Sequence, residues 1–172
     1  MLTDFRIDFG QDGLQDWISV ELVFSGCRKA LSGNPCKGCH NPALWTFENS
    51  GPFENPMQAL EKQLLTWKEK DVEFEGIVLL GGEPVDQDPD EVIEAVGLVH
   101  QHYPDLPVMI YIGYDTLDEL PQTSGKIVAL CDFVKIGGYK EEIPPREGSR
   151  LASGNQRVYR CAEGVLGEEI FF

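Results

Sequence analysis

Residues 76–84 read Gly-Ile-Val-Leu-Leu-Gly-Gly-Glu-Pro, an apolar run that stops at two glycines, a glutamate and a proline. A short, uninterrupted apolar run is typical of a strand that is buried on both faces of a parallel sheet. Helices are predicted on either side of it, one from Asn55-Pro56 to about Glu69 and one from Asp88-Pro89 onward, with Glu91 at the glutamate position of a capping box. In each helix the first residue can act as N-cap and proline fits the first helical position.

Further strands are predicted on both sides of this unit. They are Ile18–Phe24, Val108–Ile112, Phe133–Ile136 and, as a last strand, Arg157–Arg160, with a short helix at Thr116–Leu120. Alternating strands and helices predict an α/β fold with a mostly parallel sheet and right-handed crossovers. No linker divides the chain, so we expect one domain over residues 1–172.

The unusual residues of the chain follow the predicted strands. A cysteine-containing loop begins at Ser25-Gly26, Gly-Gly-Glu-Pro occupies residues 81–84, Gly113-Tyr114 ends the third strand, and Gly137-Gly138 ends the fourth. In parallel folds, sites collect at the carboxyl ends of the strands. We therefore expect these segments to share one site.

Three cysteines in the first loop, Cys27, Cys36 and Cys39, are candidate metal ligands. Three thiolates suit a four-iron cluster in which one iron has no protein ligand, and an open position is what a catalytic metal centre needs. Two alternatives stay open. The loop could hold a structural zinc ion with His40 as fourth ligand, or Cys36 and Cys39 could form a thioredoxin-like redox pair.

The segment Gly81–Pro84 also has two interpretations. The glycines allow close approach of a ligand, and the carboxylate of Glu83 with nearby carbonyl groups could receive an amino group. Alternatively, the segment is an ordinary strand-to-loop turn with a solvated glutamate.

Composition limits the function classes. With 29 acidic and 14 basic residues among 172, the net charge is −15, which argues against nucleic-acid binding and fits either simple solubility or a partner with a basic docking surface. No apolar run approaches the roughly 20 residues of a membrane span, and residues 1–10 do not resemble a signal peptide. We therefore expect a cytoplasmic protein, in which Cys131 and Cys161 are buried apolar residues rather than ligands.

The cysteine loop, Gly38-Cys39-His40-Asn41-Pro42 and Gly-Gly-Glu-Pro resemble the radical S-adenosylmethionine superfamily. More narrowly, the chain resembles the activating proteins of anaerobic (class III) ribonucleotide reductases. That likeness extends through residues 111–114, 132–142 and Asn155-Gln156-Arg157, and it covers roughly Phe9 to Arg160. The eight residues between Cys27 and Cys36 exceed the usual spacing of the family.

The resemblance implies a partial, open TIM-like barrel of the radical S-adenosylmethionine type. It also implies that Cys27, Cys36 and Cys39 hold a [4Fe-4S] cluster that cleaves S-adenosylmethionine reductively. Gly81, Gly82, Glu83 and Pro84 would receive the methionine amino group. His40, Asn41, Tyr114 and Lys135 are further candidate cofactor-binding residues, Lys135 either contacting carboxylate or adenine or facing solvent.

The implied activity is that of a radical S-adenosylmethionine oxidoreductase that installs a glycyl radical on an anaerobic ribonucleoside-triphosphate reductase. The reductase would be the protein substrate, and a flavodoxin- or ferredoxin-like protein the electron donor. Two rival functions are a small radical enzyme that acts on a metabolite, similar to 7-carboxy-7-deazaguanine synthase, and a non-catalytic metal-binding module.

Overall fold

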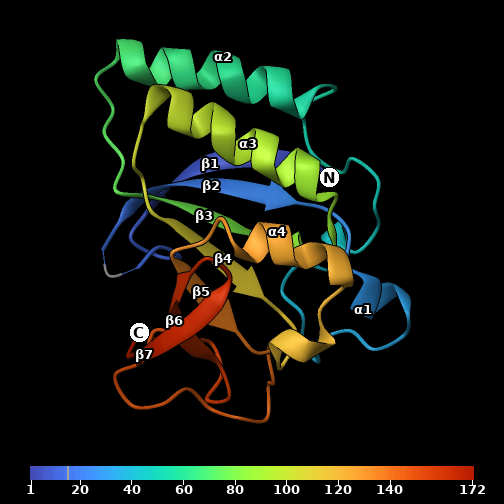
Figure 1. Cartoon of the computed structure of the whole chain (residues 1–172). Helices are drawn as coiled ribbons and strands as arrows, with labels where there is room; N and C mark the ends of the chain where they lie inside the picture. Colours follow the sequence, from blue (N-terminus) through green and yellow to red (C-terminus); the bar gives the residue numbers. More distant parts are fainter. Residues whose placement is uncertain (15) are drawn as a thin grey trace.

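The computed structural model describes residues 1–14 and 16–172, and these form one seven-stranded sheet. The strands lie side by side in chain order: β1 (Leu2–Phe9), β2 (Ile18–Phe24), β3 (Gly76–Gly81), β4 (Val108–Ile112), β5 (Phe133–Ile136), β6 (Arg157–Ala162) and β7 (Val165–Ile170). Strands β2 to β5 pair in parallel, whereas β1 at one edge and β6 and β7 at the other pair antiparallel. The carboxyl ends of the four parallel strands therefore lie along one edge of the sheet (Figure 1).

The α-helices of the described residues are α1 (Arg28–Leu31), α2 (Pro56–Glu69), α3 (Pro89–His102) and α4 (Gly125–Val128). Asn55 and Asp88 cap α2 and α3 with their side chains, which confirms both predicted helix starts. Glu91, however, does not complete a capping box. Its carboxylate accepts a hydrogen bond from the backbone N–H of Leu2 at 2.7 Å, and so links α3 to β1.

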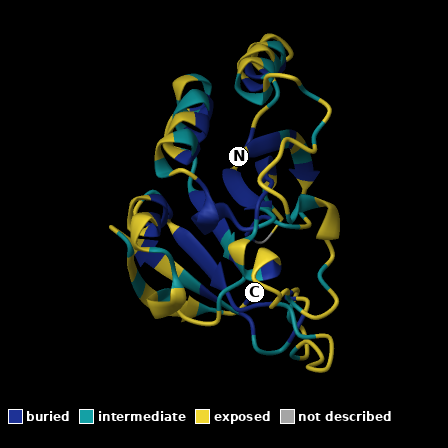
Figure 2. Ribbon diagram, turned by 90° about the vertical axis from the view of Figure 1, so that its right-hand side faces the viewer, coloured by how far each residue is buried: buried dark blue, intermediate teal, exposed yellow. Residues whose placement is uncertain are grey.

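One face of the sheet packs against α2, α3 and α4 (Figure 1). Alternate residues of the strands point to this face, including Ile77 and Leu79 on β3 and Ile110 and Ile112 on β4, and all four are fully buried. Figure 2 shows that buried residues follow the sheet while the helices carry exposed residues on their outer sides. The helix-covered face is thus the main hydrophobic core.

The opposite face of the same strands is less uniformly apolar. Met109 and Phe133 pack there with Leu151 of the long segment between β5 and β6, in a smaller cluster. Charged residues share this face, among them Glu21 on β2 and Lys135 on β5, and both are buried. We call this side of the sheet the polar face.

Most of the predicted elements are confirmed, including the strands at 18–24, 108–112 and 133–136. The sheet is mixed rather than mostly parallel, because β1 and β7 were not predicted and both pair antiparallel. The short helix expected at Thr116–Leu120 is a single 3-10 turn at Leu117–Glu119. That the sheet belongs to a partial barrel, and that residues 1–172 form one domain, stay predictions.

Within the part of the chain that the structure describes, no helix is long and apolar enough to cross a membrane.

Candidate iron–sulfur site

The cysteine loop leaves the carboxyl end of β2 and is held by backbone hydrogen bonds. The N–H groups of Gly26 and Cys27 donate to the carbonyl oxygens of Leu44 and Trp45, at 2.8 and 2.9 Å. Cys27 is the N-cap of α1, and its Sγ accepts from the N–H of Ala30 at 3.4 Å. The first cysteine is therefore fixed from both sides of the loop.

Cys36 and Cys39 lie in a tight turn at the far end of the loop. The N–H of Cys39 donates to the carbonyl oxygen of Cys36 at 3.1 Å, and Gly38 between them has a φ of +75°. Residues that carry a side chain rarely adopt this backbone angle, so the glycine permits the turn. The Sγ of Cys39 also accepts a hydrogen bond from Nε1 of Trp45 at 3.4 Å.

Glycines at the ends of β4 and β5 leave room for Cys36. A Cβ atom on Gly138 would lie 3.1 Å from the Cys36 Sγ and 2.8 Å from the carbonyl oxygen of Gly113. A Cβ atom on Gly113 would lie 3.8 Å from the same sulfur and 2.8 Å from a carboxylate oxygen of Glu83. The cysteine loop, Gly-Gly-Glu-Pro and the ends of β4 and β5 therefore meet, as the sequence predicts.

The three cysteines fit an iron–sulfur cluster better than a single metal ion. All are free thiols and half-buried. Among the described residues their sulfurs do not all lie within 4.8 Å of one another. Thiolates on one zinc ion would lie about 3.8 Å apart, since each Zn–S bond is about 2.3 Å. In a cluster, by contrast, each thiolate binds a different iron.

Buried acids beside Cys27 affect its protonation. Burial, followed by the nearby carboxylates of Glu83 and Asp86, raises the pKa of the Cys27 thiol to about 11. A metal centre must therefore displace this proton to bind, and its positive charge would interact favourably with the two carboxylates.

The segment Gly81–Pro84 is not a solvated turn. Gly81 has a φ of +122°, and a Cβ atom on it would lie 2.3 Å from the carbonyl oxygen of Phe24. A Cβ atom on Gly82 would lie 2.5 Å from that of Leu44. The two glycines thus allow β3 to pass directly against β2 and the cysteine loop.

Glu83 is only 2% exposed. One of its carboxylate oxygens, Oε2, accepts from the N–H of Gly113 at 2.8 Å, while the other, Oε1, is buried and has no hydrogen-bond partner among the described residues. Burial raises the pKa of Glu83 to about 8, against the opposing effect of that N–H. Its carbonyl oxygen accepts from Nε2 of Gln87, which also holds the carbonyl oxygen of Gly26.

A cavity of about 370 Å³ opens at this edge of the sheet. Eight residues predicted for the site line it, namely Cys36, Cys39, His40, Asn41, Gly81, Gly82, Pro84 and Lys135. Three others, Cys27, Glu83 and Tyr114, lie outside its lining. Glu83 reaches the cavity wall through its hydrogen bond to Gly113, whereas the hydroxyl of Tyr114 donates to Oδ1 of Asp86 at 2.9 Å.

Lys135 enters the cavity from the polar face of β5. Its side chain is 9% exposed, and Nζ lies 4.8 Å from the ring centroid of Tyr111. Burial lowers the pKa of Lys135 to about 8, and the negative charge of Glu83 opposes that shift. Of the two environments that the sequence allows for this lysine, the structure gives the cavity and not the solvent.

His40 and Asn41 lie at the mouth of the cavity and are exposed. The ring of His40 lies 4.7 Å from that of Tyr139, and Nδ2 of Asn41 donates to the carbonyl oxygen of Gly81 at 3.4 Å. Asn41 therefore connects the cysteine loop to the glycines. The roles assigned to these residues in cofactor binding stay predictions.

The sequence did not indicate two contributors to the site. Asp86, two residues after Gly-Gly-Glu-Pro, is buried and accepts from the N–H of Arg28 at 2.6 Å. Lys29, in the extended spacing between the first two cysteines, donates from Nζ to the carbonyl oxygen of Gly113 at 2.9 Å. The extra residues thus form α1 and place the ammonium of Lys29 against the end of β4, a contact that only the folded loop reveals.

The outlying cysteines are buried, as predicted. Cys131 donates its thiol to the carbonyl oxygen of Ile127, and Cys161 to that of Val128. Both belong to the core beneath the helices.

Three free thiols in the loop after β2 form a ligand set that suits an iron–sulfur protein. A family model described as a 4Fe-4S single cluster domain matches residues 17–159, a range that contains all three cysteines, and the chain belongs to this family. No curated protein and no solved structure matches the chain.

Proposed function

We propose that this protein cleaves S-adenosylmethionine reductively and generates a glycyl radical on an anaerobic ribonucleoside-triphosphate reductase. One observation carries the proposal: the Cys36–Cys39 turn and Gly81-Gly82 line the same cavity as Lys135. A molecule bound in this cavity could therefore contact the cluster thiols, the exposed backbone of the two glycines and the ammonium of Lys135.

Cys27, Cys36 and Cys39 would hold a [4Fe-4S] cluster, because their thiols are free and lie in the one loop that follows β2. Such a cluster, when bound, supplies the electron and the open iron for cleavage of the sulfonium. The rest of the task belongs to the chain, which must bind and orient the substrate and exclude water from it.

The groups around the cavity suit the two ends of an amino acid. The backbone at Gly81-Gly82 can approach a ligand amino group closely, because neither residue carries a side chain. Buried Glu83 follows this backbone, and one of its oxygens has no hydrogen-bond partner in the part of the chain that the structure describes. The ammonium of Lys135 lies in the cavity lining, where it can pair with a ligand carboxylate.

An open sheet supports a protein substrate. In the described part of the chain, β1 and β7 are both edge strands, so the sheet does not close on itself. A segment of a partner protein could therefore reach the cavity from the side. The net charge of −15 would favour a partner with a basic docking surface.

The test is anaerobic. The protein is reconstituted with iron and sulfide, reduced and mixed with S-adenosylmethionine, and 5′-deoxyadenosine is measured in the wild type and in Cys36→Ala. Addition of the glycyl-radical reductase should then give the doublet signal of a glycyl radical in electron paramagnetic resonance. Absence of 5′-deoxyadenosine from the iron-loaded wild type contradicts radical chemistry, and a protein that holds zinc and no iron would be a metal-binding module.

A metabolite substrate is the second candidate, and the positive charge around the cavity favours it. Arg6 and Arg150 line the cavity together with Lys135, so an anionic small molecule could be held from several sides. Under this alternative, 5′-deoxyadenosine forms but the reductase acquires no glycyl radical. An anionic metabolite should then raise 5′-deoxyadenosine production in the wild type, and less so in Lys135→Met.

A further inference from the structure

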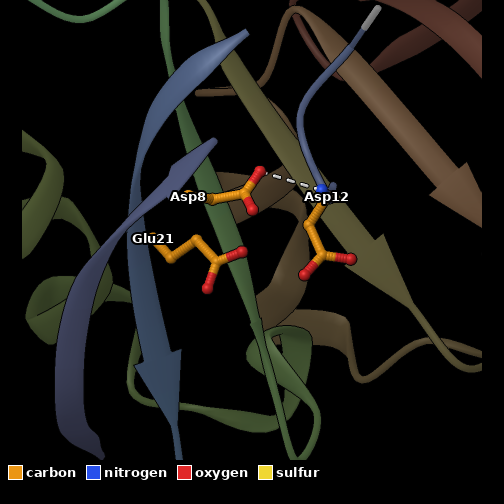
Figure 3. A group of neighbouring side chains, drawn as sticks. All are labelled: Asp8, Asp12 and Glu21. Atoms are coloured by element: carbon orange, nitrogen blue, oxygen red, sulfur yellow. Dashed lines mark hydrogen bonds between the residues drawn. The ribbon is translucent and has the colours of Figure 1, made fainter. Parts of the chain in front are cut away.

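Strands β1 and β2 and the loop that joins them bring three carboxylates together on the polar face of the sheet (Figure 3). Asp8 comes from β1, Asp12 from the loop and Glu21 from β2, and one oxygen of each lies within 4.8 Å of the other two. Asp8 is 7% exposed and Glu21 is 1% exposed. Like charges this close and this well buried repel one another strongly unless something neutralises them.

Within the described part of the chain, one ion pair is formed by this group. The Nε of Arg6 pairs with Oε2 of Glu21. Asp8 and Asp12 form no ion pair within the described part of the chain. Asp8 instead uses Oδ2 to accept from the N–H groups of Gln11 and Asp12, at 2.8 and 2.9 Å. The other oxygen of Asp8 is left for a further contact.

Two buried oxygen atoms at this place have no hydrogen-bond partner among the described residues, Oε1 of Glu21 and Oγ of Ser19. Ser19 is fully buried, lies directly opposite Asp8 in the β1–β2 register and precedes Glu21 by two residues. Its side chain therefore points to the same face as both acids. A buried polar group without a partner costs about 1–3 kcal/mol, so these two oxygens indicate a missing ligand.

We propose that Asp8, Asp12, Glu21 and Ser19 bind a hard divalent cation, Mg²⁺ or Ca²⁺, between β1 and β2. Such cations take oxygen ligands, and two oxygens on opposite sides of one Ca²⁺ ion lie about 4.8 Å apart. When all three carboxylates are ionised, the ion pair between Arg6 and Glu21 leaves Asp8 and Asp12 unpaired among the described residues, and a divalent ion would balance their two charges. The site contains no sulfur ligand and is separate from the cysteine loop.

The cation site is connected to the cavity through Tyr111. The hydroxyl of Tyr111 donates to the backbone oxygen of Asp12 at 2.8 Å, and its ring lies beneath Nζ of Lys135. Asp12, Tyr111 and Lys135 all line the cavity. A bound cation therefore holds the β1–β2 loop as a fixed wall of the cavity, and cavity ligands should bind more tightly when it is present.

Calorimetric titration of the iron-loaded protein with Ca²⁺ and, separately, with Mg²⁺ tests the proposal. We expect one site for at least one of these ions, with affinity at least tenfold lower in Asp12→Asn and binding lost in Glu21→Gln. Glu94→Gln, which removes an exposed acid from α3, is the control and should bind as the wild type does. Terbium emission sensitised by Tyr111 gives a second readout, since its hydroxyl contacts Asp12 directly.

Two results would overturn the proposal. One is the absence of saturable binding of either ion at millimolar concentration. The other is equal affinity in the wild type, Asp12→Asn and Glu21→Gln, which would mean that ions bind elsewhere on an acidic surface. Titration of Cys36→Ala separates this site from the cluster, because its cation affinity should equal that of the wild type even if no radical chemistry is found.

Discussion

The two faces of strands β4 and β5 carry residues of different kinds. Toward the helices, Ile110, Ile112 and Val134 are fully buried in one apolar cluster. On the polar face, the neighbouring Tyr111 and Lys135 line the cavity. The hydroxyl of Tyr111 donates to the backbone oxygen of Asp12, and Nζ of Lys135 lies over the ring of Tyr111. One strand therefore contributes alternately to stability and to the candidate site, and substitutions one residue apart should have separable effects.

The largest expected effect is the loss of the cluster. Cys39→Ala should abolish iron binding, since it removes one of three thiol ligands, as measured by bound iron and visible absorbance after anaerobic reconstitution. Cys131→Ala, under the helices, is the matched control. It should keep its iron and lose only about 1 kcal/mol of unfolding free energy. Equal iron content in both variants would contradict the assignment of Cys39.

Next in size is truncation of the helix-covered face. Ile110→Ala should lower the free energy of unfolding by about 2–5 kcal/mol, because it leaves a cavity in a fully buried cluster. Tyr111→Phe, one residue further on, removes only the hydrogen bond to Asp12 and should cost about 1 kcal/mol. Urea unfolding of both variants measures the two losses of unfolding free energy. Losses of similar size would contradict the separation of the two faces.

A pH effect of on the order of 1–3 kcal/mol is expected from Glu21. Burial and contact with Asp12, opposed by Arg6, raise the pKa of Glu21 to about 7 from an ordinary value of 4.5. Because the folded state holds the proton more tightly, this contribution to stability is complete below pH 4.5 and is lost as the pH rises through 7. Urea unfolding in the absence of Mg²⁺ and Ca²⁺ should show that the difference in unfolding free energy between the wild type and Glu21→Gln changes over this pH range. A difference that stays constant with pH would contradict the raised pKa.

The smallest expected effect on stability comes from a pair of glycines. A Cβ atom on Gly97 of α3 would meet no described atom within 4 Å apart from its chain neighbours and the backbone of its own helix. Gly97→Ala should therefore stabilise the protein by about 0.5–1 kcal/mol, since alanine is the better helix former. Gly138→Ala would press on Gly113 and Cys36 and should reduce the iron content instead. Thermal melting and iron analysis of both variants measure the two effects. Full iron content in Gly138→Ala would show that Cys36 can move away.

The central part of the fold was predictable from sequence because its signals are local. A continuous apolar run predicted β3, a short run interrupted only by Lys135 predicted β5, and an N-cap followed by proline predicted α2 and α3. β1 was not predicted, although its apolar residues alternate with Asp4, Arg6 and Asp8. That alternation is typical of a strand with one polar face, and the structure confirms a strand at these residues, paired with β2.

The candidate site was predictable only in part. Because parallel strands end at one edge, the sequence could bring Cys36, Gly81 and Gly138 together without coordinates. It could not orient Lys135, since the choice between cavity and solvent depends on what covers the polar face. The carboxylates of Asp8 and Glu21 meet only through the register of β1 and β2, which the sequence does not specify. The glutamate between apolar residues of β2 was nevertheless a signal, because a buried carboxylate needs a partner.

The strand order of the sheet has a consequence for the order in which the protein is made. Since each strand pairs with the one before it in the chain, the sheet can grow at one edge as the chain leaves the ribosome. The cysteine loop emerges early, whereas Gly113 and Gly138, which contact Cys36, emerge much later. Iron delivered during synthesis would meet the three thiols before Gly113 and Gly138 are in place beside Cys36. The machinery that loads the cluster should therefore act on the completed chain.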